Sequence, residues 1–373
     1  MMVLVLLVIL VYAVTIAQLI YGFGKVRTYT PTPQSPQTYF SIVIPFRNEA
    51  QNLPALLQSI ANLDYPIGLF ELIFIDDDSH DDSQRIVYNW RMDHGTYQCT
   101  LLENVRMTGS PKKDAIARAI HIVKHQWVVT TDADCTFASD WLRTLDGYIQ
   151  QHCPQMLIGS VRYAHTRLLL AQFQQLDLAS LQGATIGSFG LGPGFMCNGA
   201  NFAYTKDFFH ELGGFAGNQH TATGDDVFLV QKAVATHPDR VHYLKSAGNI
   251  VTTAPLQSWR AVFEQRVRWA SKTGHYQSVF GKDLAVIVFA GNLSVIVAVV
   301  MAGLQGTWIV AAIAFAVKFT VDAVLLYRAN RFLTRDGMWG LLPCSMIYPF
   351  FCVAVAVYSM AFGYSWKGRR FRR

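Results

Sequence analysis

Two predominantly apolar stretches, residues 1–24 and 283–364, place the strongest constraint on how this 373-residue chain can fold. Charged residues make up 15% of the chain, against about 25% in a typical soluble domain, and the deficit lies in these two stretches. About twenty consecutive apolar residues suffice to cross the hydrocarbon core of a bilayer. We therefore expect membrane segments near both ends of the chain and a separate folded domain between them.

The first apolar stretch predicts a transmembrane anchor over residues 1–22. No basic residue precedes it, and Lys25 and Arg27 follow it, which is the reverse of the charge order in a signal peptide. Because basic residues favour the cytoplasmic side, the N-terminus is expected outside and the following domain in the cytoplasm. Residues 23–38 contain several prolines and few apolar residues, so they predict an extended linker.

The second apolar stretch contains three candidate membrane segments, at residues 284–304, 308–327 and 341–362. The arginines that follow the second segment and the basic tail, residues 365–373, both favour the cytoplasm. One span between them cannot satisfy both. We therefore expect the third segment to be re-entrant or interfacial, and the alternative is a tail on the outer side.

Lys318 and Asp322 are two ionisable residues inside the second of these segments. Their i, i+4 spacing puts them on one helix face, where the two charges can offset each other. We expect a structural ion pair. The alternatives are a role toward substrate and a lysine whose ammonium reaches the membrane interface.

Residues 39–275 alternate between short apolar runs and helical patterns, which predicts βαβ units and a largely parallel sheet in one α/β domain. The expected strands lie at residues 40–44, 70–75, 127–131, 156–161, 195–204 and 240–243. The expected helices lie at residues 51–63, 81–90, 112–123, 168–181 and 256–270.

Acidic residues follow three of these strands at the point where each strand ends. Asp132 and Asp134 come directly after the strand that begins at residue 127, and Asp77 and Glu49 follow the two earlier strands. The carboxyl ends of parallel strands form the ligand crevice of an open α/β sheet, so we expect these side chains to line one crevice. Two carboxylates that face one spot suit Mg²⁺ or Mn²⁺. A helix N-cap explains any one of these groups, but it explains all three badly.

Two further groups lie downstream. Asp225 and Asp226 precede an apolar run, and an isolated acidic pair of this kind is most simply the first turn of a helix. Gln265, Arg268 and Trp269 lie at i, i+3 and i+4 of a predicted helix and share one face. An amide, a guanidinium and an indole on one face suit a pyrophosphate beside a sugar-like or apolar group. A helix along the membrane surface is the alternative, and both can hold together.

Taken together and in order, these residues resemble the membrane-bound, inverting glycosyltransferases of family 2, which have a GT-A fold. The matching segments are Pro45 to Glu49, Asp76-Asp77-x-Ser79, Asp132-x-Asp134, Asp225-Asp226 and Gln265-x-x-Arg268-Trp269. The resemblance covers residues 39–275, and the arrangement of one anchor and several C-terminal membrane segments is also similar. Each motif alone is weak, whereas five in order are specific.

The resemblance implies a role for each matching residue. The residues implied in donor binding are Pro45, Arg47, Glu49, Asp77, Lys112, Asp132, Asn198, Gly199, Gln265 and Arg268. Within this set Asp77 would hold the nucleotide base, and Gln265 and Arg268 would steady the pyrophosphate. Asp134 is implied as the direct ligand of Mg²⁺ or Mn²⁺, with Asp132 near the metal and the ribose. Asp226 is implied as the catalytic base, with Asp225 and Trp269 on the acceptor side.

Two positions depart from the family pattern. Asp78 stands where the family usually has a glycine, and it adds a carboxylate for which the sequence names no partner. Asp225 stands where glutamate is usual, which shortens that side chain but leaves Asp226 unaltered.

The resemblance implies an enzyme that moves a sugar from a nucleotide diphosphate sugar, with a lean to uridine diphosphate, onto a lipid acceptor. Its place would be the cytoplasmic face of the plasma (inner) membrane, as a multi-pass protein. A processive polysaccharide synthase is the first alternative, and a non-catalytic scaffold that binds a nucleotide sugar is the second. Few membrane segments favour the lipid acceptor, and a scaffold would need no catalytic base.

The remaining composition bears on other partners. The formal charge is +6, and the basic residues cluster beside the apolar stretches, so we expect no nucleic-acid partner. The six cysteines show no paired spacing, which favours reduced thiols and suits a cytoplasmic domain.

Overall fold

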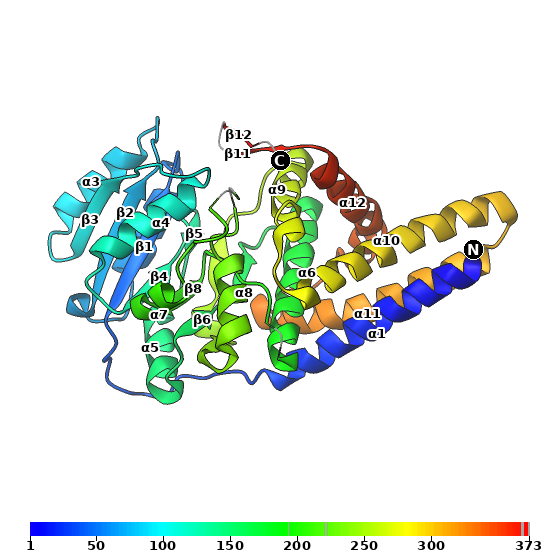
Figure 1. Ribbon diagram of the computed structural model, residues 1–373, viewed down its shortest axis with the longest axis horizontal. Helices are drawn as coiled ribbons and strands as arrows, with labels where there is room; N and C mark the ends of the chain where they lie inside the picture. Colours follow the sequence, from blue (N-terminus) through cyan, green and yellow to red (C-terminus); the bar gives the residue numbers. More distant parts are fainter. Residues whose placement is uncertain (193, 220, 222, 367–368, 372–373) are drawn as a thin grey trace. The chain divides into compact units, whose positions relative to one another are not determined.

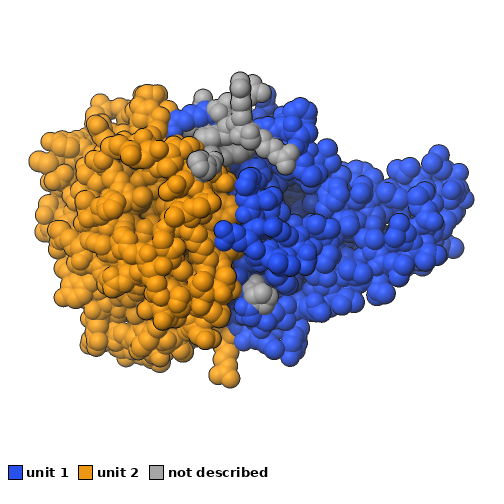
Figure 2. Space-filling view, in the orientation of Figure 1, with its two compact units in different colours: residues 1–26, 163–195, 255–373 blue, residues 27–162, 196–254 orange. Residues whose placement is uncertain are grey.

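The computed structural model describes residues 1–192, 194–219, 221, 223–366 and 369–371. The chain divides into two compact units (Figure 2). Unit 1 comprises residues 1–26, 163–195 and 255–373, and unit 2 comprises residues 27–162 and 196–254. Residues 163–195 and 255–275, which the sequence pattern places in the α/β domain, group with the terminal helices in unit 1.

Unit 2 is built on a seven-stranded sheet with the order β3-β2-β1-β4-β8-β6-β9 (Figure 1). Its strands are β1 (Phe40–Phe46), β2 (Phe70–Asp76), β3 (Gln98–Glu103), β4 (Trp127–Thr130), β6 (Met156–Ile158), β8 (Phe202–Thr205) and β9 (Val241–Tyr243). Strands β3, β2, β1 and β4 are parallel, whereas β8 is antiparallel to both of its neighbours. The apolar runs of β1 and β2 are almost wholly buried, as expected for central strands with both faces covered.

Helices and a small second sheet complete unit 2. The helices are α2 (Leu53–Ala61), α3 (Ser83–Asp93), α4 (Pro111–Ile122), α5 (Trp141–His152), α7 (Lys206–Glu211), α8 (Val227–Thr236), η1 (Ile67–Leu69), η2 (Pro238–Arg240) and η3 (Ala247–Asn249). The second sheet has the order β5 (Cys135–Thr136), β10 (Val251–Thr253) and β7 (Val161–Tyr163). Pro111 opens α4, where the fixed φ of proline suits the first helical position.

The predicted α/β class with a parallel sheet is confirmed, but three strand predictions need correction. The expected strand at residues 195–204 is wrong over most of its length, because the N–H of Asn201 closes a turn on the carbonyl of Asn198 and only β8 is extended. The strand expected at 156–161 is broken in two, where the Asn201 side chain packs against Gly159. Strand β3 was not predicted, because an edge strand that begins with exposed polar residues has no continuous apolar run.

Unit 1 consists mainly of helices. They are α1 (Met2–Lys25), α6 (Leu169–Leu191), α9 (Trp259–Ala270), η4 (Thr273–His275), α10 (Val279–Gln305), α11 (Trp308–Leu333) and α12 (Leu341–Ala361). Of the described helices, four are long and apolar enough to cross a membrane, namely α1, α10, α11 and α12. Figure 1 shows α1 running alongside α11, with α10 and α11 joined by a tight turn. The chain ends in a hairpin of β11 (Tyr364–Trp366) and β12 (Arg369–Phe371).

Glycines bring α1 and α6 into backbone contact. A Cβ atom added at Gly190 would overlap the carbonyl oxygen of Gly22, and one added at Gly187 would overlap that of Leu19. In membrane proteins the hydrophobic effect does not drive helices together, because lipid tails are as apolar as the side chains. Small residues then allow two helix backbones to pack in direct contact. These glycines therefore fix how closely α1 packs against α6.

Lys318 and Asp322 form the ion pair expected from their spacing. Lys318 Nζ lies 2.6 Å from Asp322 Oδ2, and the Tyr12 hydroxyl of α1 donates to Asp322 Oδ1, also at 2.6 Å. The ammonium also lies 4.9 Å from the centre of the Tyr12 ring. Because the two charges compensate each other and both contact Tyr12 of α1, the geometry agrees with a structural pair.

Replacing Gly190 by alanine should destabilise unit 1. An alanine in a helix interior normally gains about 1 kcal/mol over glycine, but overpacking against the Gly22 carbonyl should cost about 1–3 kcal/mol. Gly303 of α10 is the matched control, because an added Cβ there meets no atom within 4 Å. Thermal unfolding of the detergent-solubilised chain should show a lower Tm for Gly190→Ala and an unchanged or higher Tm for Gly303→Ala. Equal Tm values for both variants would contradict the contact.

Candidate active site

Polar residues follow four parallel strands at one edge of the main sheet. In the order β3-β2-β1-β4, the chain leaves the sheet through Asn104, Asp77, Arg47 and Thr131, respectively. Because these strands are parallel neighbours, their carboxyl ends meet at the same edge. Two groups of contacting side chains occur there, one around Asp77 and one around Lys112.

The Asp77 carboxylate is held by two donors from the end of β3. Arg106 Nε lies 3.0 Å from Asp77 Oδ1, and Asn104 Nδ2 donates to the same oxygen at 2.9 Å. Arg47, at the end of β1, donates from Nη1 to the backbone carbonyl of Asp77 at 2.6 Å. Asp77 and Arg47 are both buried. A buried carboxylate needs such compensation, so this group forms a preorganised polar cluster.

Asp78 has two arginine partners, which the sequence alone could not name. Its carboxylate lies 3.0 Å from Arg47 Nη1 and 2.9 Å from Arg106 Nη2. These hydrogen bonds to the two guanidinium groups hold the pKa of Asp78 below its usual value. Its φ of 63° lies in the left-handed region, which favours glycine and tolerates aspartate. The backbone thus suits the family's usual glycine, while the aspartate adds a bridge between two arginines.

Lys112, in the first turn of α4, joins two acidic groups that are distant in sequence. Its Nζ lies 2.6 Å from Asp132 Oδ1 and 3.4 Å from Asp225 Oδ2. Burial by itself lowers the pKa of Lys112, but the carboxylates of Asp132 and Asp225 outweigh it and raise the pKa. The lysine therefore stays protonated and holds the end of β4 next to the acidic pair before α8.

Asp226 is the N-cap residue of α8, and both of its carboxylate oxygens accept backbone N–H groups. The N–H of Val227 donates to Oδ1 at 2.7 Å, and that of Gly199 donates to Oδ2 at 2.8 Å. The Thr130 hydroxyl in turn donates to the Gly199 carbonyl at 2.9 Å. A Cβ at Gly199 would lie 3.1 Å from Lys112 Nζ, so glycine allows this close approach. Asp226 is thereby fixed beside Lys112, with oxygen lone pairs still able to accept a proton.

The donor atoms near Asp134 suit a hard divalent cation that is held largely by substrate. Asp132 and Asp134 supply carboxylate oxygens, and both carboxylates, after burial, help to raise the pKa of the Cys135 thiol. In the part of the chain that the structure describes, no three His, Cys, Asp or Glu side chains are grouped as a metal site. Mg²⁺ is commonly held by one or two carboxylates and completed by phosphate oxygens and water, which requires no such group. The residues present therefore fit Mg²⁺ or Mn²⁺ of this kind and not a closed protein cage.

Three predicted donor residues make contacts outside these two groups. The Glu49 carboxylate accepts from Asn52 Nδ2 at 2.6 Å, and its N–H donates to Ser83 Oγ at 2.7 Å. Pro45 lies within β1, paired in register with Ile75 of β2. Asn198 is half-buried in the turn before β8. Their roles toward a nucleotide stay predictions.

Gln265, Arg268 and Trp269 lie on α9 and belong to unit 1, whereas the other predicted residues belong to unit 2. The helical spacing expected for them is confirmed, and all three are partly exposed. Gln265 Oε1 accepts from the Tyr163 hydroxyl at 3.3 Å and from Arg266, a residue that the motif does not include.

Sequence reasoning missed three residues that organise these groups. Asn104 and Arg106 were overlooked because β3 was not predicted; the signal was the polar turn after Leu101-Leu102, which repeats the pattern of the other strand ends. Arg266 was overlooked because the motif Gln265-x-x-Arg268-Trp269 leaves its position open, and the sequence carries no signal for its partner Asp177.

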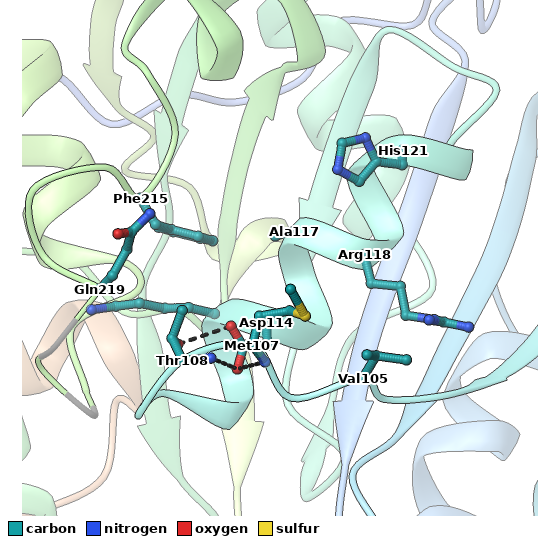
Figure 3. Close-up of a pocket in the computed structure, with 10 residues that line it drawn as sticks. Val105, Met107, Thr108, Asp114, Ala117, Arg118, His121, Phe215 and Gln219 are labelled. Atoms are coloured by element: carbon teal, nitrogen blue, oxygen red, sulfur yellow. Dashed lines mark hydrogen bonds between the residues drawn. The ribbon is translucent and has the colours of Figure 1, made fainter.

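A cavity of about 360 Å³ lies beside α4 (Figure 3). Its walls include Asp114 and Arg118 of α4 together with Met107 and Phe215. The Asp114 carboxylate accepts the backbone N–H groups of Met107 and Thr108 and the Thr108 hydroxyl. None of the predicted site residues lines this cavity, so it is separate from the groups around Asp77 and Lys112.

Comparison with known proteins finds similarity over part of the chain. Residues 41–213 match the family model "Glycosyl transferase family 2". A β-monoglucosyldiacylglycerol synthase of Trichormus variabilis is 28% identical over 120 residues, which are 32% of this chain and 25% of that protein. The poly(ribitol-phosphate) β-N-acetylglucosaminyltransferase TarS of Staphylococcus aureus is 27% identical over 128 residues, 34% of this chain and 22% of that protein. The matches thus span about a quarter of the length of these curated relatives.

A solved structure is similar to this chain at the level of fold. The mannosyltransferase PcManGT of Pyrobaculum calidifontis, in complex with GDP-Man and Mn²⁺, aligns over 95% of both chains with a TM-score of 0.58 and 17% identity. At this identity the likeness concerns the fold, and it agrees with the mixed α/β sheet of GT-A transferases. The match to the family model extends from β1 to α7, so this part of the chain is similar to glycosyl transferase family 2.

Proposed function

We propose that this protein is an inverting glycosyltransferase that moves one sugar from a nucleotide diphosphate sugar onto a membrane lipid. The observation that carries the proposal is the convergence of Lys112, Asp132 and the Asp225-Asp226 pair, from three separate segments of unit 2, around one ammonium group. A purely structural role would not require three carboxylates beside one lysine. A donor diphosphate and an acceptor hydroxyl would require such a set.

The donor is assigned to the carboxyl edge of the sheet. Asp77, fixed by Arg106 and Asn104, would accept an N–H of the nucleotide base, with Arg47, Pro45 and Glu49 around the nucleoside. Asp132 and Lys112 would face the ribose and the phosphates, and Asn198 and Gly199 would border the sugar. On α9, Gln265 and Arg268 would bind the pyrophosphate. The lean to a uridine nucleotide is part of the proposal.

Transfer follows a single displacement. When bound through Asp134, Mg²⁺ or Mn²⁺ supplies positive charge that stabilises the leaving diphosphate. Asp226 accepts the proton of the acceptor hydroxyl as that oxygen attacks the anomeric carbon. The bond between the anomeric carbon and the phosphate oxygen breaks on the opposite side, and its electron pair leaves with the nucleoside diphosphate. One displacement inverts the anomeric centre, with Asp225 and Trp269 on the acceptor side.

The lipid acceptor is supported by two observations. One relative is named for a glucosyldiacylglycerol product, and four described helices are long and apolar enough to cross a membrane. The other relative is named for a poly(ribitol-phosphate) acceptor, so a polymer acceptor is the alternative. We propose residues 1–22 as the anchor, 23–38 as the linker, 39–275 as the transferase domain, 283–364 as membrane segments and 365–373 as a basic tail, in a multi-pass protein of the plasma (inner) membrane.

The acceptor proposal is tested with membranes that contain the protein. They are incubated with Mn²⁺ and a panel of labelled nucleotide sugars, and lipid and polymer fractions are extracted separately. Label in the lipid fraction supports the proposal, whereas label confined to the polymer fraction supports a synthase. Nucleotide-sugar binding without transfer to either fraction would indicate a scaffold.

Two substitutions should separate donor binding from transfer. Asp134→Ala should remove the Mn²⁺-dependent part of donor binding, because it deletes the proposed ligand. Asp226→Asn should leave donor binding within about twofold and reduce transfer by about 10²-fold or more, because the base is lost. Donor binding is measured by calorimetry and transfer by product formation.

Asp207→Asn is the matched control, because Asp207 is an exposed aspartate in the first turn of α7. It should leave both binding and transfer unchanged. Asparagine at position 226 keeps an oxygen for the N–H of Val227 but places its NH₂ group opposite the N–H of Gly199, so its Tm should fall and is measured to show that the variant is folded. Substantial transfer by a folded Asp226→Asn protein would overturn the assignment of the base.

The proposed topology predicts which positions are reached from outside the cell. Val5 and Ile9 of α1 pack in one cluster with Ala302 and Ala311, which flank the turn between α10 and α11. The start of α1 and this turn therefore belong on the same membrane side, which the basic residues assign to the outside. In a background with the exposed Cys153 replaced by serine, Gln305→Cys should react with an impermeant maleimide on intact cells.

Exposed positions of the transferase domain serve as the internal comparison, because they should not be labelled on intact cells. Arg85→Cys and Gln151→Cys should react only after the cells are permeabilised, because unit 2 is proposed to be cytoplasmic. Labelling of either position on intact cells would contradict the topology.

A further inference from the structure

Arg266 is a buried cation on α9 that neither the motif nor the proposed mechanism uses. Its side chain and that of Asp177 on α6 are exposed by only 5% and 6%, respectively. Arg266 Nε donates a hydrogen bond to Asp177 Oδ2. Removing two charges from water carries a large cost, and hydrogen bonds to the other guanidinium nitrogens are needed to offset it.

One of these other guanidinium nitrogens, Nη1, donates a hydrogen bond to Gln265. Arg266 Nη1 donates to Gln265 Oε1 and lies 3.4 Å from the Tyr163 hydroxyl oxygen, while that hydroxyl donates to the same Oε1 at 3.3 Å. A guanidinium can only donate, so the amide atom that faces Arg266 must be the oxygen. The orientation of the Gln265 amide is therefore set by chemistry, and its NH₂ group is turned away from Arg266 and Tyr163.

The same guanidinium also fixes the tryptophan of the motif. The Arg266 guanidinium carbon lies 4.2 Å from the centre of the Trp269 ring. A cation stacked on an indole is stabilising and restricts the plane of the ring. One residue therefore orients both Gln265 and Trp269, the first and the last side chain of the motif.

We propose that Arg266 is a positioning residue that presents the amide N–H groups of Gln265 to a phosphate oxyanion of the donor. This inference rests on the proposed function, which assigns Gln265 to the pyrophosphate. An amide can rotate to show either its oxygen or its nitrogen, and only the nitrogen end binds an anion. With Oε1 occupied by two donors within unit 1, the nitrogen end is the one left to bind an anion, so the amide needs no rotation on binding.

Gln265→Glu tests the orientation while keeping both residues of the buried pair. A glutamate keeps an oxygen for Arg266 and Tyr163, but it replaces the outward N–H groups by a second oxygen and adds a negative charge. The protein is the purified full-length chain in detergent with Mn²⁺, and the probes are UDP, GDP, UMP and GMP. We expect Gln265→Glu to weaken binding of the preferred diphosphate by about tenfold or more, and that of the matching monophosphate by less than about twofold.

Arg266→Lys tests the positioning role itself. A lysine keeps a positive charge for Asp177, but it lacks the planar set of donors that reaches Gln265 and Trp269 at once. Diphosphate binding should weaken several-fold and monophosphate binding should not. The matched control is Arg260→Lys on the same helix, where the exposed Arg260 pairs with Glu264 and binding of both probes should stay unchanged.

The outcomes separate this inference from the proposed function. Unchanged diphosphate binding by Gln265→Glu would overturn the inference while leaving the transferase proposal in place. Equal weakening of monophosphate and diphosphate binding by both variants would also overturn it, because that pattern indicates a general structural role. If the unaltered chain bound no nucleoside diphosphate, the proposed function would fail and the inference with it.

Discussion

The compensation of carboxylates at one edge of a parallel sheet is the constraint on which the rest of this domain depends. Four neighbouring strands deliver their carboxyl ends to the same edge, and acidic residues follow three of them, β1, β2 and β4. Carboxylates so placed repel one another unless cations lie between them. Arg47 and Arg106 meet this need around Asp77, and Lys112 meets it around Asp132. The loop before α8 is in turn drawn to Lys112 through Asp225.

The same constraint explains how much of the site the sequence could predict. Strands β1, β2 and β4 are continuous apolar runs, so their ends, and with them Asp77 and Asp132, were found by pattern alone. Strand β3 is an edge strand with mixed polarity and was not predicted. Without it, the sequence did not indicate that Arg106 lies at the same edge of the sheet as Asp77. Asp78 was recognised as an anomaly, but its partners come from segments about thirty residues away on either side. Such tertiary pairs leave no periodic signal in a single sequence.

Residues that share a helix face were easier to predict from sequence than the residues at strand ends. The i, i+3, i+4 face of Gln265, Arg268 and Trp269 and the i, i+4 pair of Lys318 with Asp322 depend only on local geometry, so both were predictable. Tyr12 and Asp177, which complete the two groups, lie on other helices and were not. The packing of α1 on α6 likewise depends on three glycines whose partners are backbone atoms of a remote helix. Residues that share one helix face can thus be predicted from sequence, whereas their partners on other helices cannot.

The charge balance around Lys112 bears on the order of binding. The fields of Asp132, Asp225 and Asp226 all act to raise the pKa of this one lysine, so three negative charges face one positive charge. A free diphosphate approaching this group would meet net repulsion, and a free divalent cation would meet net attraction. A cation paired with the diphosphate reduces the repulsion and brings its own positive charge to the acidic excess. If this group binds a nucleoside diphosphate as proposed, its charges favour a metal-bound nucleotide over a bare one.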